Sequence, residues 1–494
     1  MSQEEHQEFL DEPQAGQASR RGFAKTAWTV VAILVLASIF LQGRRNQEEG
    51  GESQNAVQQS VLDVQGQYLV AASQVPGVQK SQLYESAKTL GTGPLFMRLR
   101  FVVLAGELVG PDEAIKQADA AQKEMLKQKV RESETDERVV TALHRLYSDY
   151  QEGQWDAPSL EADEHKLLRD ELGWFGALAL SPNRPTAKDA ESAGADPGRE
   201  RVLAAAWRTF AVVILATLIM LGVGVAGLGG AITFLVLVVR RKMRSAILTG
   251  SGNSAIYAET FAVWMLLFLA LTLAAAFIVR NHPDSQLLVS SVASILSLGA
   301  LIWPVLRGVP WSQVRHDTGF YLGRKPFREI LWGVVCYVSN LPVLAIGLLA
   351  TLALLAIYSA VAGGPVGLDP VDAPTHPVIE WARDAGWIGR THIFLLACLI
   401  APIIEETVFR GILYRHLREG TAKWRTGSSV AFSVGFNSLI FAVIHPQGLI
   451  AAPALMAVAA GLSLAREWRG SLLAPITMHA TNNGVLMLLL FSLL

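Results

Sequence analysis

The chain has little cysteine and no excess of charge of either sign. Its 494 residues include two cysteines, Cys336 and Cys398, and its formal net charge is −1. Two cysteines, both inside apolar runs, exclude a disulfide framework and a zinc site built from thiolates. The balanced charge gives no indication of a nucleic-acid partner, and we expect none.

Long apolar runs are what the chain has in abundance. It is 51% hydrophobic, with a mean hydropathy of +0.32. Because about 20 mostly apolar residues cross a bilayer, the runs predict nine spans: 26–42, 207–239, 256–279, 286–306, 330–360, 392–414, 428–445, 449–465 and 470–492. The first follows a charged tail (1–25) and no small-x-small cleavage site follows it, which indicates a signal-anchor helix.

The long run 207–239 allows two interpretations. It is either one tilted or kinked span, or a hairpin of two. Gly222, Ala226 and Gly230 are four apart in it. On one helix this spacing would let a neighbouring helix approach closely, although a flexible patch in the middle of the helix is an equal alternative.

Polar segments divide the chain into regions. Residues 46–182 combine charge with helical spacing of apolar residues, which predicts a helical soluble domain. Residues 183–201 are rich in Pro, Ala, Gly and charge and indicate a linker. Additional transmembrane helices occupy 202–389, and the last spans form a core at 390–494. The predicted fold class is an all-α polytopic membrane protein with an anchored, N-terminal helical soluble domain.

Loop charge predicts the orientation. With the N-terminus inside, the inner loops carry 15 Lys and Arg and the outer loops carry 3. Cytoplasmic loops are the ones enriched in these residues. We therefore expect a plasma-membrane protein with a cytoplasmic N-terminus and an extracytoplasmic soluble domain. A hairpin at 207–239 would instead place that domain in the cytoplasm.

The run 399–417, LIAPIIEETVFRGILYRHL, places two carboxylates and a guanidinium where an ionised group is costly. Glu406 and Arg410 are four apart, so they share a helix face and can pair. Glu405 lies about 100° around the helix. One carboxylate is thus neutralised by Arg410 and the other is left available.

Two later apolar segments add polar groups. One contains Phe441-Ala-Val-Ile-His445, and the other contains His479-Ala-Thr-Asn-Asn483. We expect these groups and Glu405 to face the bundle interior or a wet cavity. A carboxylate and an imidazole can deprotonate water, while a second imidazole and an amide can stabilise an oxyanion. Glu405, His445 and His479 could also bind a divalent metal such as zinc.

The three motifs together resemble the CPBP family of intramembrane proteases, also called the CAAX-protease and bacteriocin-processing, or Abi, family. The family pattern is E-E-x-x-x-R, then F-x-x-x-H, then H-x-x-x-N. The resemblance covers roughly residues 390–494 and implies a helical bundle with a cavity inside the bilayer. It implies that Glu405 and His445 activate water, and that His479 and Asn483 stabilise the oxyanion.

The resemblance also assigns supporting roles and a substrate class. Glu406 and Arg410 would orient the site, with Phe441 as part of the motif. The family is conventionally classed as metalloprotease, but a metal-free glutamate mechanism fits the same residues. The partners implied are the lipid bilayer and a membrane-associated peptide or protein. The soluble domain either recruits or gates that substrate or is a separate interaction module.

Other functions remain open from the residues alone. Glu405 and the histidines could relay protons in an ion-coupled transporter, although residues 202–330 and 330–494 show no inverted repeat. A non-catalytic scaffold is a third class, but no motif residue is lost. Each motif taken singly has a structural explanation, such as a helix-end histidine or an ion pair. The apolar runs contain no HExxH, G-x-S-G or G-x-G-D signature.

Overall fold

A computed structural model describes residues 23–48, 52–128, 134–156, 158–183, 197–323, 325–362, 381–382 and 385–493. All regular structure in these ranges is helical, which confirms the all-α fold class. The contacts divide the chain into two compact units. We call Gln54–Gly222 the small unit, and Met1–Ser53 with Val223–Ser492 the bundle unit. Most of the predicted tail 1–25 and linker 183–201 lies outside the described residues.

The small unit is built on a central buried helix, α5 (Leu95–Leu108). Val102, Val103 and Leu104 on α5 are completely buried. Apolar side chains of the surrounding helices pack against it in one core. These helices are α3 (Glu52–Ala72), α4 (Lys80–Ala87), α6 (Pro111–Gln128), α7 (Glu134–Gln151), α8 (Ala162–Leu172), α9 (Trp174–Ala179) and the first turns of α10 (Pro197–Val239).

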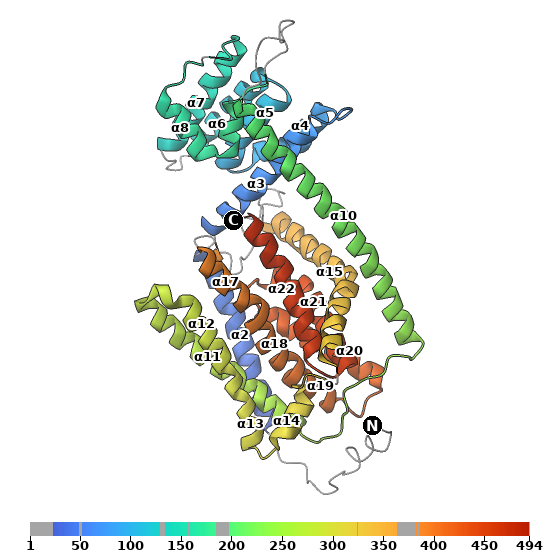
Figure 1. Cartoon of the computed structure of the whole chain (residues 1–494). Coiled ribbons are helices and arrows are strands. Elements are labelled where there is room, and N and C mark those ends of the chain that lie inside the picture. Colours follow the sequence, from blue (N-terminus) through green and yellow to red (C-terminus); the bar gives the residue numbers. More distant parts are fainter. Residues whose placement is uncertain are drawn as a thin grey trace. The chain divides into compact units, whose positions relative to one another are not determined.

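The bundle unit contains the first helix and the C-terminal half of the chain (Figure 1). Its helices are α2 (Ala24–Glu48), α11 (Ser254–Asn281), α12 (Gln286–Ser297), α13 (Ile302–Leu306), α14 (Trp311–Thr318), α15 (Pro326–Ala362), the run α17–α19 (Trp387–Gly420), α20 (Thr426–Ile444), α21 (Ala452–Arg469) and α22 (Leu473–Leu493). The helix predicted as a signal anchor, α2, packs against α11 and α20 through buried Ala27 and Val31.

Seven helices among the described residues are long and apolar enough to cross a membrane: α10, α11, the run Pro283–Leu306, α15, the run Trp387–Gly420, α20 and the run Leu449–Arg469. The chain is therefore a multi-pass membrane protein. The prediction of nine spans also included α2 and α22. The apolar part of α2 is shorter, Ala24–Phe40. Helix α22 contains polar His479, Asn482 and Asn483 and is not among these seven.

The run 207–239 lies within one continuous helix of 43 residues, α10, and is not a hairpin. Close approach to α15 occurs, but only partly through the predicted residues, because Gly230 takes part in it and Gly222 does not. A Cβ on Gly227 would lie 2.5 Å from the carbonyl oxygen of Val338, and one on Gly230 would lie 2.3 Å from Ser339 Oγ, whereas Gly222 faces open space. The glycines in contact are thus three residues apart. The remaining surface of α10 is apolar and exposed, as a lipid-facing helix requires.

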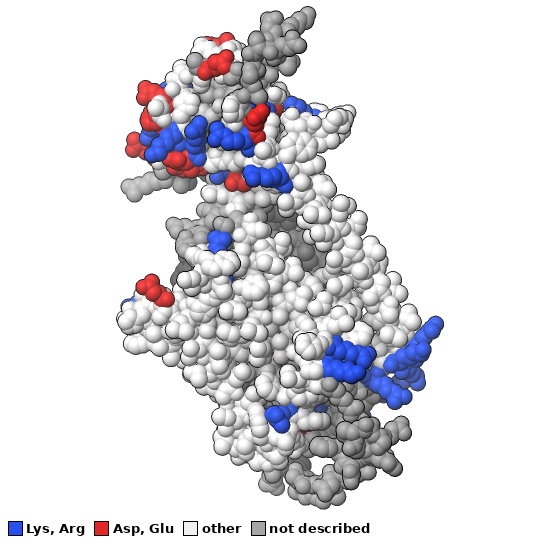
Figure 2. Space-filling model, viewed as in Figure 1, with Lys and Arg blue, Asp and Glu red and all other residues white. Residues whose placement is uncertain are grey.

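Charged side chains are unevenly distributed over the molecule. Figure 2 shows Lys, Arg, Asp and Glu gathered on the small unit and sparse over the middle of the bundle unit. Large apolar side chains such as Phe277, Leu349 and Leu488 are exposed there. Because water-exposed apolar surface on this scale is unfavourable in a soluble protein, this belt is the surface that contacts lipid.

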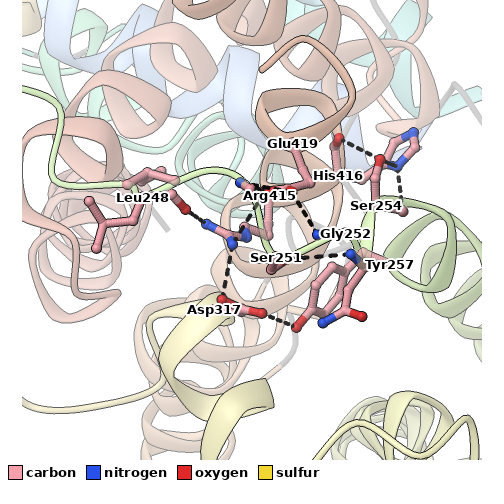
Figure 3. Close-up of polar contacts among 12 residues, drawn as sticks. Leu248, Ser251, Gly252, Ser254, Tyr257, Asp317, Arg415, His416 and Glu419 are labelled. Atoms are coloured by element: carbon pink, nitrogen blue, oxygen red, sulfur yellow. Dashed lines mark hydrogen bonds and ion pairs between the residues drawn. The ribbon is translucent and has the colours of Figure 1, made fainter. Parts of the chain in front are cut away.

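A buried polar cluster holds the C-terminal end of the run Trp387–Gly420 in place (Figure 3). Arg415 lies 3.0 Å from Asp317 Oδ1, and Tyr257 donates a hydrogen bond of 2.8 Å to the other oxygen of Asp317. Glu419 accepts hydrogen bonds from the backbone N–H groups of Gly250 and Gly252. The loop after α10 and helix α14 are thereby tied to α19 (Tyr414–Gly420).

Candidate functional site: a carboxylate and two imidazoles inside the bundle

Glu405 lies in the middle of the run Trp387–Gly420, at the end of α18 (Ala401–Glu405). The helix is π-helical on both sides of α18, in η5 (Leu396–Ile400) and η6 (Glu406–Leu413). Such wide turns insert an extra residue and frequently occur at functional sites. Glu405 and Glu406 are adjacent on this run and face different partners.

Glu406 and Arg410 form the ion pair that their spacing predicts. Arg410 Nη1 donates to Glu406 Oε1 over 3.0 Å, and both side chains are completely buried. Arg410 also donates to the carbonyl oxygen of Ala459 on α21. Its guanidinium carbon lies 4.6 Å from the centre of the Phe441 ring, a cation–π distance. The charge of Arg410 is thus held by contacts from three helices.

His479 on α22 is held by the same carboxylate oxygen. Its Nδ1 donates to Glu406 Oε1 over 2.8 Å. This contact fixes the ring so that Nε2 points to the other carboxylate, 3.9 Å from Glu405 Oε2. The motifs give no sign of this link, because it depends on how α22 is placed beside η6.

His445 lies immediately after the last residue of α20. Its Nδ1 donates to the carbonyl oxygen of Phe441 over 2.7 Å, which caps the helix end. Its ring lies over the Phe441 ring at a centroid distance of 4.0 Å. Nε2 is therefore directed away from the helix and lies 3.7 Å from Glu405 Oε2. In the predicted spans 392–414 and 428–445, Glu405 lies near the middle and His445 at the end, yet the two residues meet.

Asn483 lies one turn after His479 on α22. Its Nδ2 donates to the carbonyl oxygen of Ala397, inside η5, over 2.8 Å. Asn482, which the sequence places on another face, donates to Asn483 Oδ1 over 3.1 Å. The amide of Asn483 is thus oriented by its neighbour and by the site-bearing run. The two contacts account for its carbonyl oxygen and for one of the two N–H groups on Nδ2.

Glu405 Oε2 is the atom on which the site converges. It is buried from solvent and has no hydrogen-bond partner among the described residues. The distances to the two Nε2 atoms, 3.7 and 3.9 Å, are too long for direct hydrogen bonds. A polar contact of this length is commonly bridged by water. The arrangement can hold a water molecule between a carboxylate and an imidazole.

The expected metal ligands Glu405, His445 and His479 are the residues that meet here. Each imidazole donates its Nδ1–H elsewhere and turns Nε2 inward, as metal-bound histidines do. However, no group of three or more His, Cys, Asp or Glu side chains in the described part of the chain has the geometry to hold a metal ion. We therefore derive no step of the chemistry through a metal.

Comparison with known proteins agrees with this site. Residues 387–485, which are 99 of the 494, match the model of a family described as type II CAAX prenyl endopeptidase Rce1-like. The matched segment contains Glu405, Glu406, Arg410, Phe441, His445, His479 and Asn483. No curated protein and no solved structure matches the chain. Residues 387–485 are thus an Rce1-like domain, which confirms the resemblance and supports a CAAX-type intramembrane protease acting on peptides.

Proposed function

We propose that the protein is an endopeptidase that hydrolyses peptide bonds of membrane-associated substrates with water activated by Glu405 and His445. The observation that carries the proposal is the convergence of both Nε2 atoms on Glu405 Oε2. A water about 2.8 Å from both Glu405 Oε2 and His445 Nε2 would fit their 3.7 Å separation. The neutral Nε2 of His445 can accept a hydrogen bond from this water because Nδ1 carries the proton.

In the proposed reaction, the water gives a proton to Glu405 while its oxygen bonds to the substrate carbonyl carbon. The oxyanion that forms accepts hydrogen bonds from a protonated His479 Nε2 and from the second N–H of the Asn483 amide. The proton then passes from Glu405 to the nitrogen of the leaving amine, and the C–N bond breaks. The products are a carboxylic acid, which then loses its proton to solvent, and an amine.

Glu406 and Arg410 are positioning residues in this account. Glu406 holds His479 Nδ1, and Arg410 neutralises Glu406; the side chains of Glu406 and Arg410 are completely buried. Phe441 orients the His445 ring through the ring contact and through the hydrogen bond to its backbone carbonyl. Removing any of these contacts should change the geometry of the reacting groups without removing a reacting group.

The function is tested by cleavage of a peptide library and of prenylated and unprenylated C-terminal peptides, with new termini identified by mass spectrometry. We expect cleavage by the wild type and none by Glu405→Ala. Transport would replace proteolysis as the explanation if the folded wild type left every peptide intact and moved protons across liposomes in a Glu405-dependent way. Parallel reactions with a chelator, and with zinc restored, test the metalloprotease classification. Bacteriocin-like precursors in the library test the Abi assignment.

The orientation is part of the proposal. Arg240, Arg241 and Lys242 are exposed at the end of α10, and such clusters favour the cytoplasmic side. We therefore propose that the N-terminus lies in the cytoplasm and the small unit outside the plasma membrane. A membrane-impermeant maleimide should label Ser159→Cys but not Ser251→Cys in intact cells, in a background with both native cysteines replaced. The reverse pattern would invert the orientation.

A further inference from the structure

The small unit contains a pocket that the proposed chemistry does not use. It has a volume of about 340 Å³ and opens between the α5–α6 turn, α7 and α9. Tyr147 and Tyr150 of α7 and Trp155 of the following loop form aromatic walls. The volume lies at the lower end of the range for ligand pockets, roughly 300–1,000 Å³. It is suited to one large side chain or a molecule of that size.

The aromatic walls are held in place by specific contacts. The ring of Tyr147 packs directly on Gly106 of α5, where a Cβ would lie 2.4 Å from it. Tyr150 stacks on Trp155 at a centroid distance of 5.1 Å with an 11° angle between the rings, and its hydroxyl donates to the carbonyl of Ala179. The walls are therefore fixed by the fold and do not need a ligand to order them.

The polar groups of the pocket are selective for a negative charge. Glu107 is bound through both oxygens by Arg199, at 2.6 and 3.1 Å, so its charge is already neutralised. Lys80 lines the pocket and has no ion-pair partner among the described residues. Tyr147 is 5% exposed, and its hydroxyl has no hydrogen-bond partner within the described part of the chain. Burial raises the pKa of Tyr147, so this hydroxyl keeps its proton and can donate.

We propose that this pocket binds the C-terminal residue of a peptide, with a large apolar side chain between the aromatic walls and the free carboxylate at Lys80 and Tyr147. A C-terminal residue carries an apolar body and an anion within the volume available. A free amino acid would add an ammonium group beside the carboxylate. Among the described residues Glu107 is the one carboxylate that lines the pocket, and Arg199 already pairs with it. In a peptide, the C-terminal residue has an uncharged backbone amide in place of that ammonium group, so no further carboxylate is needed.

Binding is measured by calorimetry with the full chain in nanodiscs, in a Glu405→Gln background that prevents hydrolysis and makes the result independent of the proposed protease function. The probes are acetyl-Gly-Ala-Phe with a free carboxylate, the same peptide as a C-terminal amide, and free phenylalanine. We expect the acid to bind about fivefold or more tightly than the amide, because only the acid contacts Lys80 and Tyr147 as an anion.

The variants separate the pocket from other binding sites. Lys80→Gln should reduce the preference for the acid about two- to fivefold, whereas Lys166→Gln, an exposed lysine of α8 outside the pocket, should leave it unchanged. Tyr147→Phe keeps the packing on Gly106. It should weaken the binding of the peptide acid about tenfold and the binding of the peptide amide less. Equal binding of acid and amide, an unchanged preference in Lys80→Gln, or free phenylalanine binding as tightly as the peptide would overturn the proposal.

Discussion

The pair of Glu406 and Arg410 gives a quantitative test, because its two roles can be separated. Both side chains are completely buried, and Glu406 Oε1 accepts from Arg410 and from His479. In Glu406→Gln the amide oxygen can still accept from both donors, but Arg410 becomes an uncompensated buried cation. Breaking a buried pair in this way costs about 3–5 kcal/mol of unfolding free energy. We expect the lower end, about 3 kcal/mol, because the hydrogen bonds can persist.

The double variant Glu406→Leu with Arg410→Met removes both charges together. Replacing a buried ion pair by apolar groups of similar size is often nearly neutral, so we expect stability within about 1–2 kcal/mol of the wild type. Activity should nevertheless stay low, because His479 Nδ1 loses its acceptor and the ring is no longer oriented. A misplacement of about 1 Å can cost about 10²-fold in rate.

The assays are unfolding in mixed dodecyl sulfate micelles and kcat for a peptide cleaved by the wild type. A loss of less than about 1 kcal/mol of unfolding free energy in Glu406→Gln would contradict this prediction, because Arg410 would then not need the carboxylate. The prediction also fails if the double variant recovers both stability and kcat, because Glu406 would then have no positioning role. Separate readouts keep the structural and the catalytic arguments apart.

Three further outcomes follow from the contacts. Arg415→Ala should lower the unfolding free energy by about 3–5 kcal/mol, since it leaves buried Asp317 unpaired, and a loss under 1 kcal/mol in the same micelle assay would contradict the role of the cluster in Figure 3. Gly227→Ala should cost about 1–3 kcal/mol because its Cβ meets the Val338 backbone, while the matched control Gly229→Ala, facing open space, should cost nothing; equal effects would refute the packing of α10 on α15. The hydrogen bond from Tyr84 lowers the pKa of Glu113 in the folded protein. Its contribution to the unfolding free energy is therefore present above the unfolded pKa of about 4.3 and is lost as pH falls through the lower folded value. Glu113→Gln should reduce the fall of the melting temperature of the full chain at acid pH, and an unchanged fall would contradict this role.

Much of the site could be predicted because its spacing is local. The four-residue separation of Glu406 and Arg410 places them within reach on one helix, and the structure contains that pair. The hydrogen bond from Nδ1 of His445 to the carbonyl of Phe441 spans the same four residues. Both contacts are local in the chain, and the four-residue spacing on one helix was sufficient to predict the ion pair.

Contacts between helices could not be predicted in the same way. Glu406 binds His479 across 73 positions, and that depends on how α22 is placed beside η6. Of the residues Gly222, Ala226 and Gly230 predicted to approach a neighbouring helix, Gly230 contacts α15, but small residues occur all around α10 and the second contact is made by Gly227. The cluster around Arg415 joins three segments of the bundle unit and has no motif. By sequence alone Arg415 falls in an inner loop and adds to its positive charge, although its side chain is buried.

The most direct test of the central claim is the kcat/KM of one cleaved peptide for the wild type and for Glu405→Gln, with both proteins shown to be folded by their melting curves. Gln keeps the size of the side chain and removes the group that takes the proton from water. We expect a loss of at least about 10²-fold in kcat/KM, as for the removal of a general base. Cleavage by Glu405→Gln at the wild-type rate would contradict it.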